Sequence, residues 1–180
     1  MKFSQADFVE LCSNNRDLQA ELSCSGDLIL IAPTGGSSGW RISKLTFQLE
    51  AWTQKQGEGM AFDSSTVFQL PNGAMRGPDA AWVSSARWEA LSVEEQDGFP
   101  PLCPDFVIEL RSKSDRLANL QAKMEEYMSN GALLGFLIDP LEGNAHVYRP
   151  HQEPEALSQP TSLSGDPELP GLVIELARIL

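Results

Sequence analysis

The chain has 180 residues, of which 42% are apolar and 21% charged, and its formal net charge is −12; this length and composition fit one globular domain with a single core. No segment approaches the ~20 apolar residues of a membrane span, and the start lacks the pattern of a secretion signal, so we expect a cytoplasmic protein without a membrane partner. The acidity excludes a broad basic surface for nucleic acid but is compatible with a local basic groove.

The first third of the chain predicts two helices separated by a hairpin. Residues 4–15 predict a short helix that a serine caps. Alternating apolar residues in 17–33 predict a β-hairpin, and the glycine-rich segment 34–40 predicts a flexible loop. Apolar residues at helical spacing predict the longest helix over 41–57, which ends at Gly57.

The middle of the chain changes to the two-residue period of strands. Residues 60–70 predict one or two short strands, and the Pro-Asn-Gly sequence of 71–73 predicts a turn. A further strand is expected over 79–83, followed by the long connection 87–104, which holds a single helical turn. The segment 105–110 is the most apolar strand, and we expect it to be central in a sheet.

The last third predicts a helix, a hairpin and a returning C-terminal segment. A capping residue, Ser114 or Asp115, and a terminal glycine bound a helix over 114–131. Residues 133–149 predict a second hairpin. A connection rich in proline and serine follows, and residues 169–180 predict a strand or short helix that packs back onto the body.

This order of elements predicts a single domain, 1–180, of mixed α/β (α+β) class. We expect one mixed β-sheet flanked by helices, with β-hairpins toward both ends of the chain.

The central strand carries a carboxylate near its end. Residues two apart on a strand share a face, so Asp105, Val107 and Glu109 point the same way. A buried Glu109 needs a partner. If the strand that begins at Asp79 is its neighbour, the two carboxylates together suit a hard divalent ion such as Mg²⁺. Alternatively, Asp79 and Asp105 simply open strands after prolines, and Glu109 pairs with Arg111 or a helix lysine.

Lys123 is the third candidate for a functional site. Its helix directly follows the strand of Glu109 and should pack on the sheet, where the amine could stabilise negative charge that develops on a phosphate. The alternative is a lysine whose stem covers apolar surface while its ammonium group stays in water.

Several motifs in order along the chain carry a family resemblance. They are PDAAWV, PDFVIELRSKSD, a lysine followed by Tyr127 and a glycine at four-residue spacing, FLIDP, the first hairpin and the ending LPGLVIEL. Together they resemble the Uma-two family of proposed restriction endonucleases over nearly the whole chain. The resemblance implies the restriction-endonuclease-like core of the PD-(D/E)-x-K superfamily and divalent-metal hydrolysis of phosphodiester bonds.

The resemblance also implies roles for individual residues. The family's aspartate falls on Asp79 and its strand glutamate on Glu109, which would together hold the metal. The lysine of the motif is replaced by Arg111, which remains charged and is a poor proton acceptor. The helix residue Lys123 is the expected substitute, and Lys113 offers another cation.

The expected function is therefore an endonuclease that hydrolyses DNA with Mg²⁺, for which Mn²⁺ could substitute. The alternative is a catalytically inactive nuclease fold kept as a binding or assembly module, which the acidic charge and the missing adjacent lysine favour. A homodimer is a further expectation, because symmetric dimers are the commonest oligomers and nuclease folds of this type often pair across a duplex.

Overall fold

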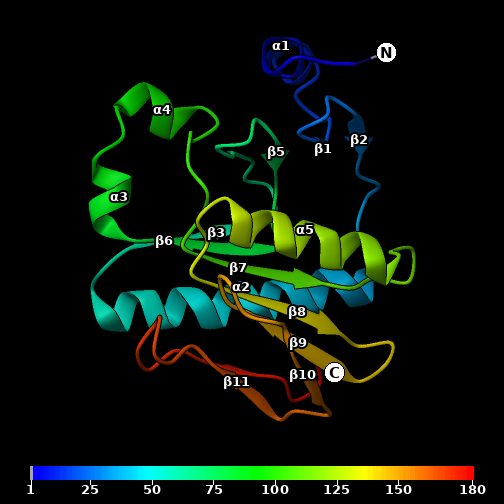
Figure 1. Ribbon diagram of the computed structural model, residues 1–180, viewed down its shortest axis with the longest axis vertical. Coiled ribbons are helices and arrows are strands. Elements are labelled where there is room, and N and C mark those ends of the chain that lie inside the picture. The colour runs from blue at the N-terminus through cyan, green and yellow to red at the C-terminus, as the bar shows by residue number, and fades with distance from the viewer. Residues whose placement is uncertain (1) are drawn as a thin grey trace.

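A computed structural model describes residues 2–180 (Figure 1). The helices are α1 (Gln5–Asn14), α2 (Gly36–Gln56), α3 (Ser85–Glu89), α4 (Val93–Asp97) and α5 (Leu117–Ser129). The strands are β1 (Ala20–Leu22), β2 (Leu28–Leu30), β3 (Met60–Asp63), β4 (Phe68–Gln69), β5 (Met75–Arg76), β6 (Ala80–Val83), β7 (Phe106–Leu110), β8 (Leu134–Asp139), β9 (Asn144–Tyr148), β10 (Glu155–Ser158), β11 (Ser162–Ser164) and β12 (Val173–Glu175). None of the helices in this part of the chain is long and apolar enough to cross a membrane.

The centre of the molecule is a six-stranded mixed sheet in the order β10-β9-β8-β7-β6-β3. The strand β7 lies inside this sheet, as predicted, antiparallel to β6 and parallel to β8. The helices α5 and α2 lie on opposite sides of the sheet (Figure 1). The predicted class, a mixed sheet flanked by helices, is confirmed.

The side chains of β7 divide between two cores. Phe106 packs in the same buried cluster as Leu45 of α2. Val107 packs in a second cluster with Met124 of α5. Because strand residues alternate between the two faces, Glu109 lies on the same face as Val107, under α5.

The N-terminal hairpin does not join the central sheet. The strands β1 and β2 pair antiparallel and combine with β5 and β4 in a separate sheet of order β2-β1-β5-β4. This small sheet lies on the α5 side of the molecule, away from α2 (Figure 1). The predicted single sheet is therefore wrong in this respect, because the hairpin pairs with β5, which lies with its own partner β4 in the connection between β3 and β6.

The loop predicted over 34–40 is wrong, because α2 begins at Gly36. The backbone N–H of Gly39 already donates to the carbonyl of Gly35, at 2.9 Å. Glycine and serine have low helix propensity, but propensity is a weak local preference. The helix continues to its C-cap at Gly57, which has a positive φ of 70° and ends the helix as predicted.

The predicted N-cap of α5 is also wrong, by one or two residues. Neither Ser114 nor Asp115 caps the helix, since α5 begins at Leu117 after Arg116. The carboxylate of Asp115 instead accepts hydrogen bonds from the backbone and hydroxyl of Ser112, at 2.8 and 2.5 Å. The residues that looked like a cap therefore stabilise the loop between β7 and α5.

Four short elements were missed by the sequence patterns, namely β5, α3, β10 and β11. Each has five residues or fewer. Such short strands depend on tertiary pairing more than on their own composition. The C-terminal segment adopts the strand alternative, β12, which pairs antiparallel with β11.

Candidate functional site

The register of the central sheet brings Asp79 and Glu109 together. Ala80 of β6 pairs with Ile108 of β7 in antiparallel register. Asp79 precedes the first of these residues and Glu109 follows the second, so the two acids lie opposite each other on one face. The Oδ2 atom of Asp79 also accepts the backbone N–H of Leu110 at 2.7 Å, which ties the acid to the neighbouring strand.

The ammonium group of Lys123 lies beside this pair of acids. Its Nζ atom is 2.7 Å from Oε1 of Glu109 and 2.7 Å from Oε1 of Glu21, and it donates to the carbonyl of Gly77 at 3.0 Å. These three acceptors match the three N–H groups of an ammonium ion. Lys123 is only 14% exposed, so its contacts are shielded from solvent.

Glu21 is the residue that sequence analysis missed. It lies in β1, is 4% exposed, and also accepts the backbone N–H of Gly77 and a charged hydrogen bond from Arg76, at 3.0 and 2.9 Å. The sequence pattern around Glu21 predicts only a strand of a hairpin. Its one sequence signal is a carboxylate inside a short strand, which is too common to single it out.

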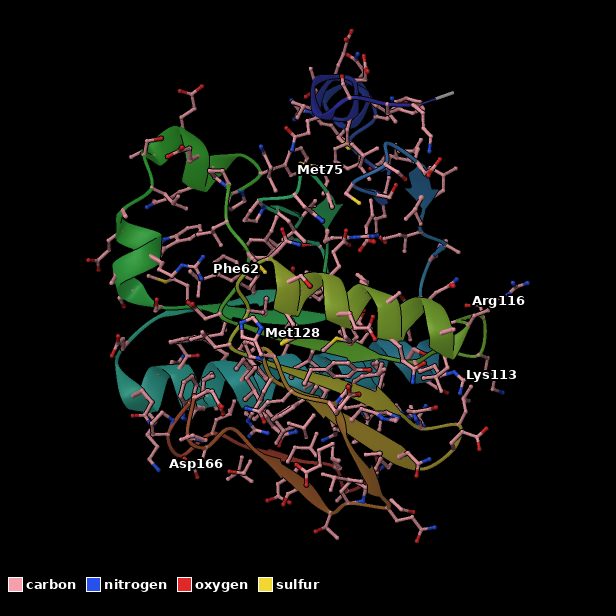
Figure 2. The ribbon with its side chains drawn as sticks, viewed as in Figure 1. Phe62, Met75, Lys113, Arg116, Met128 and Asp166 are labelled. Carbon is pink, nitrogen blue, oxygen red and sulfur yellow. The ribbon has the colours of Figure 1, made fainter. Side chains whose placement is uncertain are left out.

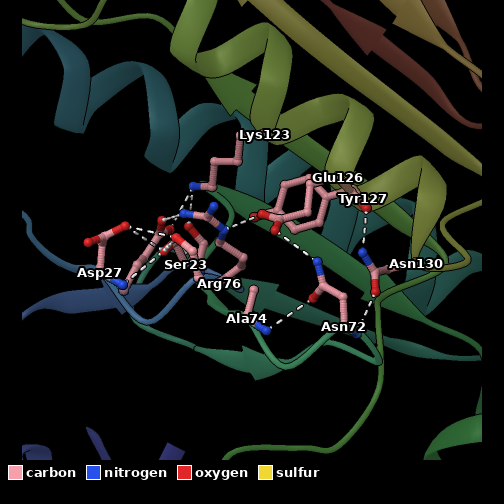
Figure 3. A network of polar contacts seen from close by, with 12 residues as sticks. Ser23, Asp27, Asn72, Ala74, Arg76, Lys123, Glu126, Tyr127 and Asn130 are labelled. Carbon is pink, nitrogen blue, oxygen red and sulfur yellow. Dashed lines mark hydrogen bonds and ion pairs between the residues drawn. The ribbon is translucent and has the colours of Figure 1, made fainter. Parts of the chain in front are cut away.

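Arg76 connects this site to the far end of α5. Its guanidinium group binds Glu21 on one side and Glu126 on the other, where the Nε–Oε2 distance is 2.5 Å. The amide of Asn72 donates to the same carboxylate at 2.9 Å, and Figure 3 shows this chain of contacts from Lys123 to Asn130. The network joins the small sheet to α5 through charges that are largely buried.

Tyr127 contributes a neutral hydrogen bond to the site. It is a fully buried residue of α5, and its hydroxyl donates to Oε1 of Glu109 at 3.1 Å. The same carboxylate oxygen thus receives both Tyr127 and Lys123, which fixes the orientation of Glu109.

The other candidate residues lie elsewhere. Arg111 forms an ion pair with the buried Asp139, at 2.7 Å. Lys113 is exposed in the loop before α5 (Figure 2). Asp105 accepts from the backbone of Ser84 and pairs with Arg87, at 2.8 and 2.6 Å. Of the three basic residues that the sequence offered, Lys123 is the one the fold places against Glu109.

Burial and neighbouring charges shift the pKa values of the three acids. Burial raises the pKa of Glu109 to about 8, and the charges of Asp79 and Glu21 add to this rise against the opposing effect of Lys123. Burial likewise raises the pKa of Asp79 to about 6. Burial opposes the ionisation of Glu21, but Lys123 and Arg76 outweigh it and lower its pKa. A further cation would therefore be stabilised here.

The pKa of Lys123 is raised even though burial alone would lower it, because Glu109 and Glu21 both favour the charged amine. Lys123 is therefore a fixed positive charge and not a proton acceptor at neutral pH.

These values predict that the metal-free protein loses stability as the pH rises. Folded Glu109 holds its proton up to about pH 8, whereas its ordinary pKa is 4.5, so the folded state binds more protons and the free energy of unfolding falls across this interval. We expect chemical denaturation in EDTA to show this loss in the native protein and a smaller loss in Glu109→Gln. Equal pH dependence in both proteins would contradict the assignment.

The acids open into a large cleft. It has a volume of about 1110 Å³, and its lining includes Glu21, Asp79, Glu109 and Lys123. Within residues 2–180, no three His, Cys, Asp or Glu side chains are grouped so as to enclose a metal ion by themselves. An ion at this place would need water or substrate oxygens to complete its ligands, as a site built on two carboxylates implies.

A mixed sheet between two helices, with paired acids and a lysine in an open cleft, is an arrangement that suits a nuclease-like protein. The family model Uma2, described as "Putative restriction endonuclease", matches residues 5–177, and the chain belongs to this family. No functionally curated protein shows significant similarity to the chain.

A solved structure shares the fold. It is described as a "putative nuclease belonging to DUF820" from Anabaena variabilis, and it matches with a TM-score of 0.74 and 21% sequence identity. The match covers 89% of this chain and 88% of the other. The similarity confirms the fold over nearly the whole length of both proteins.

Proposed function

We propose that the protein is a cytoplasmic, metal-dependent endonuclease that hydrolyses phosphodiester bonds of DNA. The observation that carries the proposal is the meeting of Asp79, Glu109 and Lys123 at one point of the cleft, with Nζ of Lys123 2.7 Å from Glu109. Membership of a family described as restriction endonucleases supports the same reaction.

The two acids fit a divalent cation. Within the described residues, Oδ1 of Asp79 and Oε2 of Glu109 have no hydrogen-bond donor, so each acid has an oxygen available to a ligand. Carboxylate oxygens are the ligands that Mg²⁺ prefers, and Mn²⁺ accepts the same set. The raised pKa values of both acids support the proposal, because a bound cation would favour the ionised form of each acid.

Each side chain of the site would have a separate role in hydrolysis. A divalent ion held by Asp79 and Glu109 would supply a coordinated water of lowered pKa and would polarise the scissile phosphate. Lys123 holds a positive charge beside the place where negative charge develops on the phosphate. Glu21 and the carbonyl of Gly77 keep that amine in position, and Tyr127 orients Glu109.

A second candidate is a nuclease fold that binds without cleaving. The observation that favours it is the complete engagement of Lys123, whose three N–H groups already have protein acceptors. In that case the charge network would serve only to join the small sheet to α5, and no metal-dependent hydrolysis would be seen.

Magnesium should stabilise the folded protein, because the ion binds the paired acids of the folded state and not the unfolded chain. At about 100 times the dissociation constant the gain is about 2.7 kcal/mol, or roughly 5–10 °C in the unfolding midpoint of a domain this size. Calorimetry with Mg²⁺ and with EDTA measures it. The same upward shift in Asp79→Asn would place the ion elsewhere.

The direct test is incubation of plasmid and single-stranded DNA with the native protein in Mg²⁺, Mn²⁺ and EDTA. We expect cleavage with either ion and none in EDTA. A protein that gains stability from Mg²⁺ but cleaves neither DNA would support the binding module instead.

A further inference from the structure

The catalytic cleft is poor in free positive charge. Its lining holds five acidic and three basic side chains, which are Glu21, Asp79, Glu109, Asp115, Glu126, Arg16, Arg76 and Lys123. Arg76 and Lys123 are neutralised by ion pairs. Arg16 is exposed and forms no ion pair with the described residues. A duplex that relied on phosphate contacts would find few partners in this cleft.

Two more cations lie at the rim. Lys113 and Arg116 are exposed on the loop before α5, at the edge of the molecule in Figure 2, and neither forms an ion pair in residues 2–180. Their neighbours Ser112 and Ser114 line the cleft. Together with Arg16, they give the cleft about three cations that are free to meet phosphate groups.

In contrast to the charged rim, the side of the cleft formed by residues 29–31 is apolar and open to solvent. Ile29, Leu30 and Ile31 line it and are 39%, 66% and 41% exposed. Aliphatic side chains at this exposure suit the faces and edges of unpaired bases better than a phosphate backbone.

A second hollow continues the cleft over α2. It has a volume of about 530 Å³ and shares Thr34 and Ser64 with the lining of the cleft. Phe47 lines this hollow and is 72% exposed. An exposed aromatic ring in a groove next to a hydrolytic site is a platform on which a base can stack.

We propose that the cleft takes a single strand of DNA, with about three phosphates near Arg16, Lys113 and Arg116 and with bases against β2 and Phe47. This inference rests on the proposed hydrolysis of DNA and narrows its substrate. Stacking on apolar surface supplies affinity that does not depend on salt, which offsets the small number of cations.

Binding of fluorescein-labelled 12-nucleotide single strands and of the matching duplex to the Asp79→Asn protein in Mg²⁺ tests the inference, because this variant should cleave too slowly to interfere. We expect at least about tenfold tighter binding of the single strand. The slope of log affinity against log salt should be about −2, which corresponds to three phosphates on a single strand.

Two changes to the groove should separate its two contributions. Phe47→Ala should weaken single-strand binding about tenfold, whereas Val93→Ala, at a site that is 73% exposed on the distant helix α4, should not. Replacing Lys113 and Arg116 by glutamine should reduce the salt slope to about −0.7. Lys55→Gln, at the other end of α2, should leave it unchanged.

Equal or tighter binding of the duplex overturns the inference, and so does failure to bind either DNA. Loss of a dimer in Phe47→Ala, seen by analytical ultracentrifugation, would also overturn it, because a second copy would then cover the groove. The proposed hydrolysis is judged separately: native protein that cleaves duplex plasmid remains a nuclease, whereas protein that cleaves neither DNA nor bis(p-nitrophenyl) phosphate does not.

Discussion

The Asp79→Asn protein is expected to hydrolyse DNA about 10³ times more slowly than the native protein. Loss of one of two carboxylates from a divalent-metal site removes several kcal/mol of stabilisation from the reaction, which corresponds to this factor. The asparagine oxygen can still accept the N–H of Leu110, so the strand contact is kept. Initial rates at saturating Mg²⁺ measure the effect.

The matched control for this change is Glu125→Gln, which removes one negative charge from the exposed face of α5. It should cleave DNA at the native rate. If both variants lost activity equally, the effect would follow from overall charge. If Asp79→Asn kept the native rate, Asp79 would not hold the ion.

The Lys123→Met protein is expected to lose about 3–5 kcal/mol of folding free energy, because the change leaves the ionised Glu21 buried without the amine that lies between it and Glu109. Methionine fills much of the volume of the lysine stem, so a cavity is not the main cause. Chemical denaturation at neutral pH gives the difference from the native protein.

Acid conditions should reduce this loss. Glu109 already holds its proton below about pH 8, and without the amine Glu21 also binds a proton more readily, so the protonated acids no longer carry buried negative charge. The difference in unfolding free energy between native protein and Lys123→Met should therefore narrow toward pH 5. Lys113→Met, at an exposed position, should be close to native at every pH. A constant deficit across this range would point to packing rather than charge.

The central part of the fold could be predicted from the sequence, because the patterns that indicate its helices and strands each lie within a short segment. The apolar run of β7, the helical spacing of α5 and the turns of the last hairpin each occupy a short window. The neighbouring position of β6 and β7 was a condition in the prediction, and their register is what places Asp79 opposite Glu109. The catalytic roles of these residues stay predictions.

The remainder depends on contacts between distant segments. Glu21 belongs to a strand of three residues, and its partners Arg76 and Lys123 lie far along the chain. No periodicity or spacing within the hairpin predicts that Glu21 contacts Arg76 and Lys123. The first turn of α2 was missed because a run of glycine and serine strongly predicts a loop. In the folded protein these residues are helical.

The wide separation of Glu21 from its partners has a consequence during synthesis. The ribosome makes about 5–20 residues per second, so Glu21 appears on the order of 5–20 seconds before Lys123, about a hundred residues later. For about half of that interval the first hairpin lacks β4 and β5, which complete its sheet, and for all of it the hairpin lacks the amine of Lys123. The acid of the nascent hairpin therefore stays without its ion-pair partner Lys123 until α5 has left the exit tunnel.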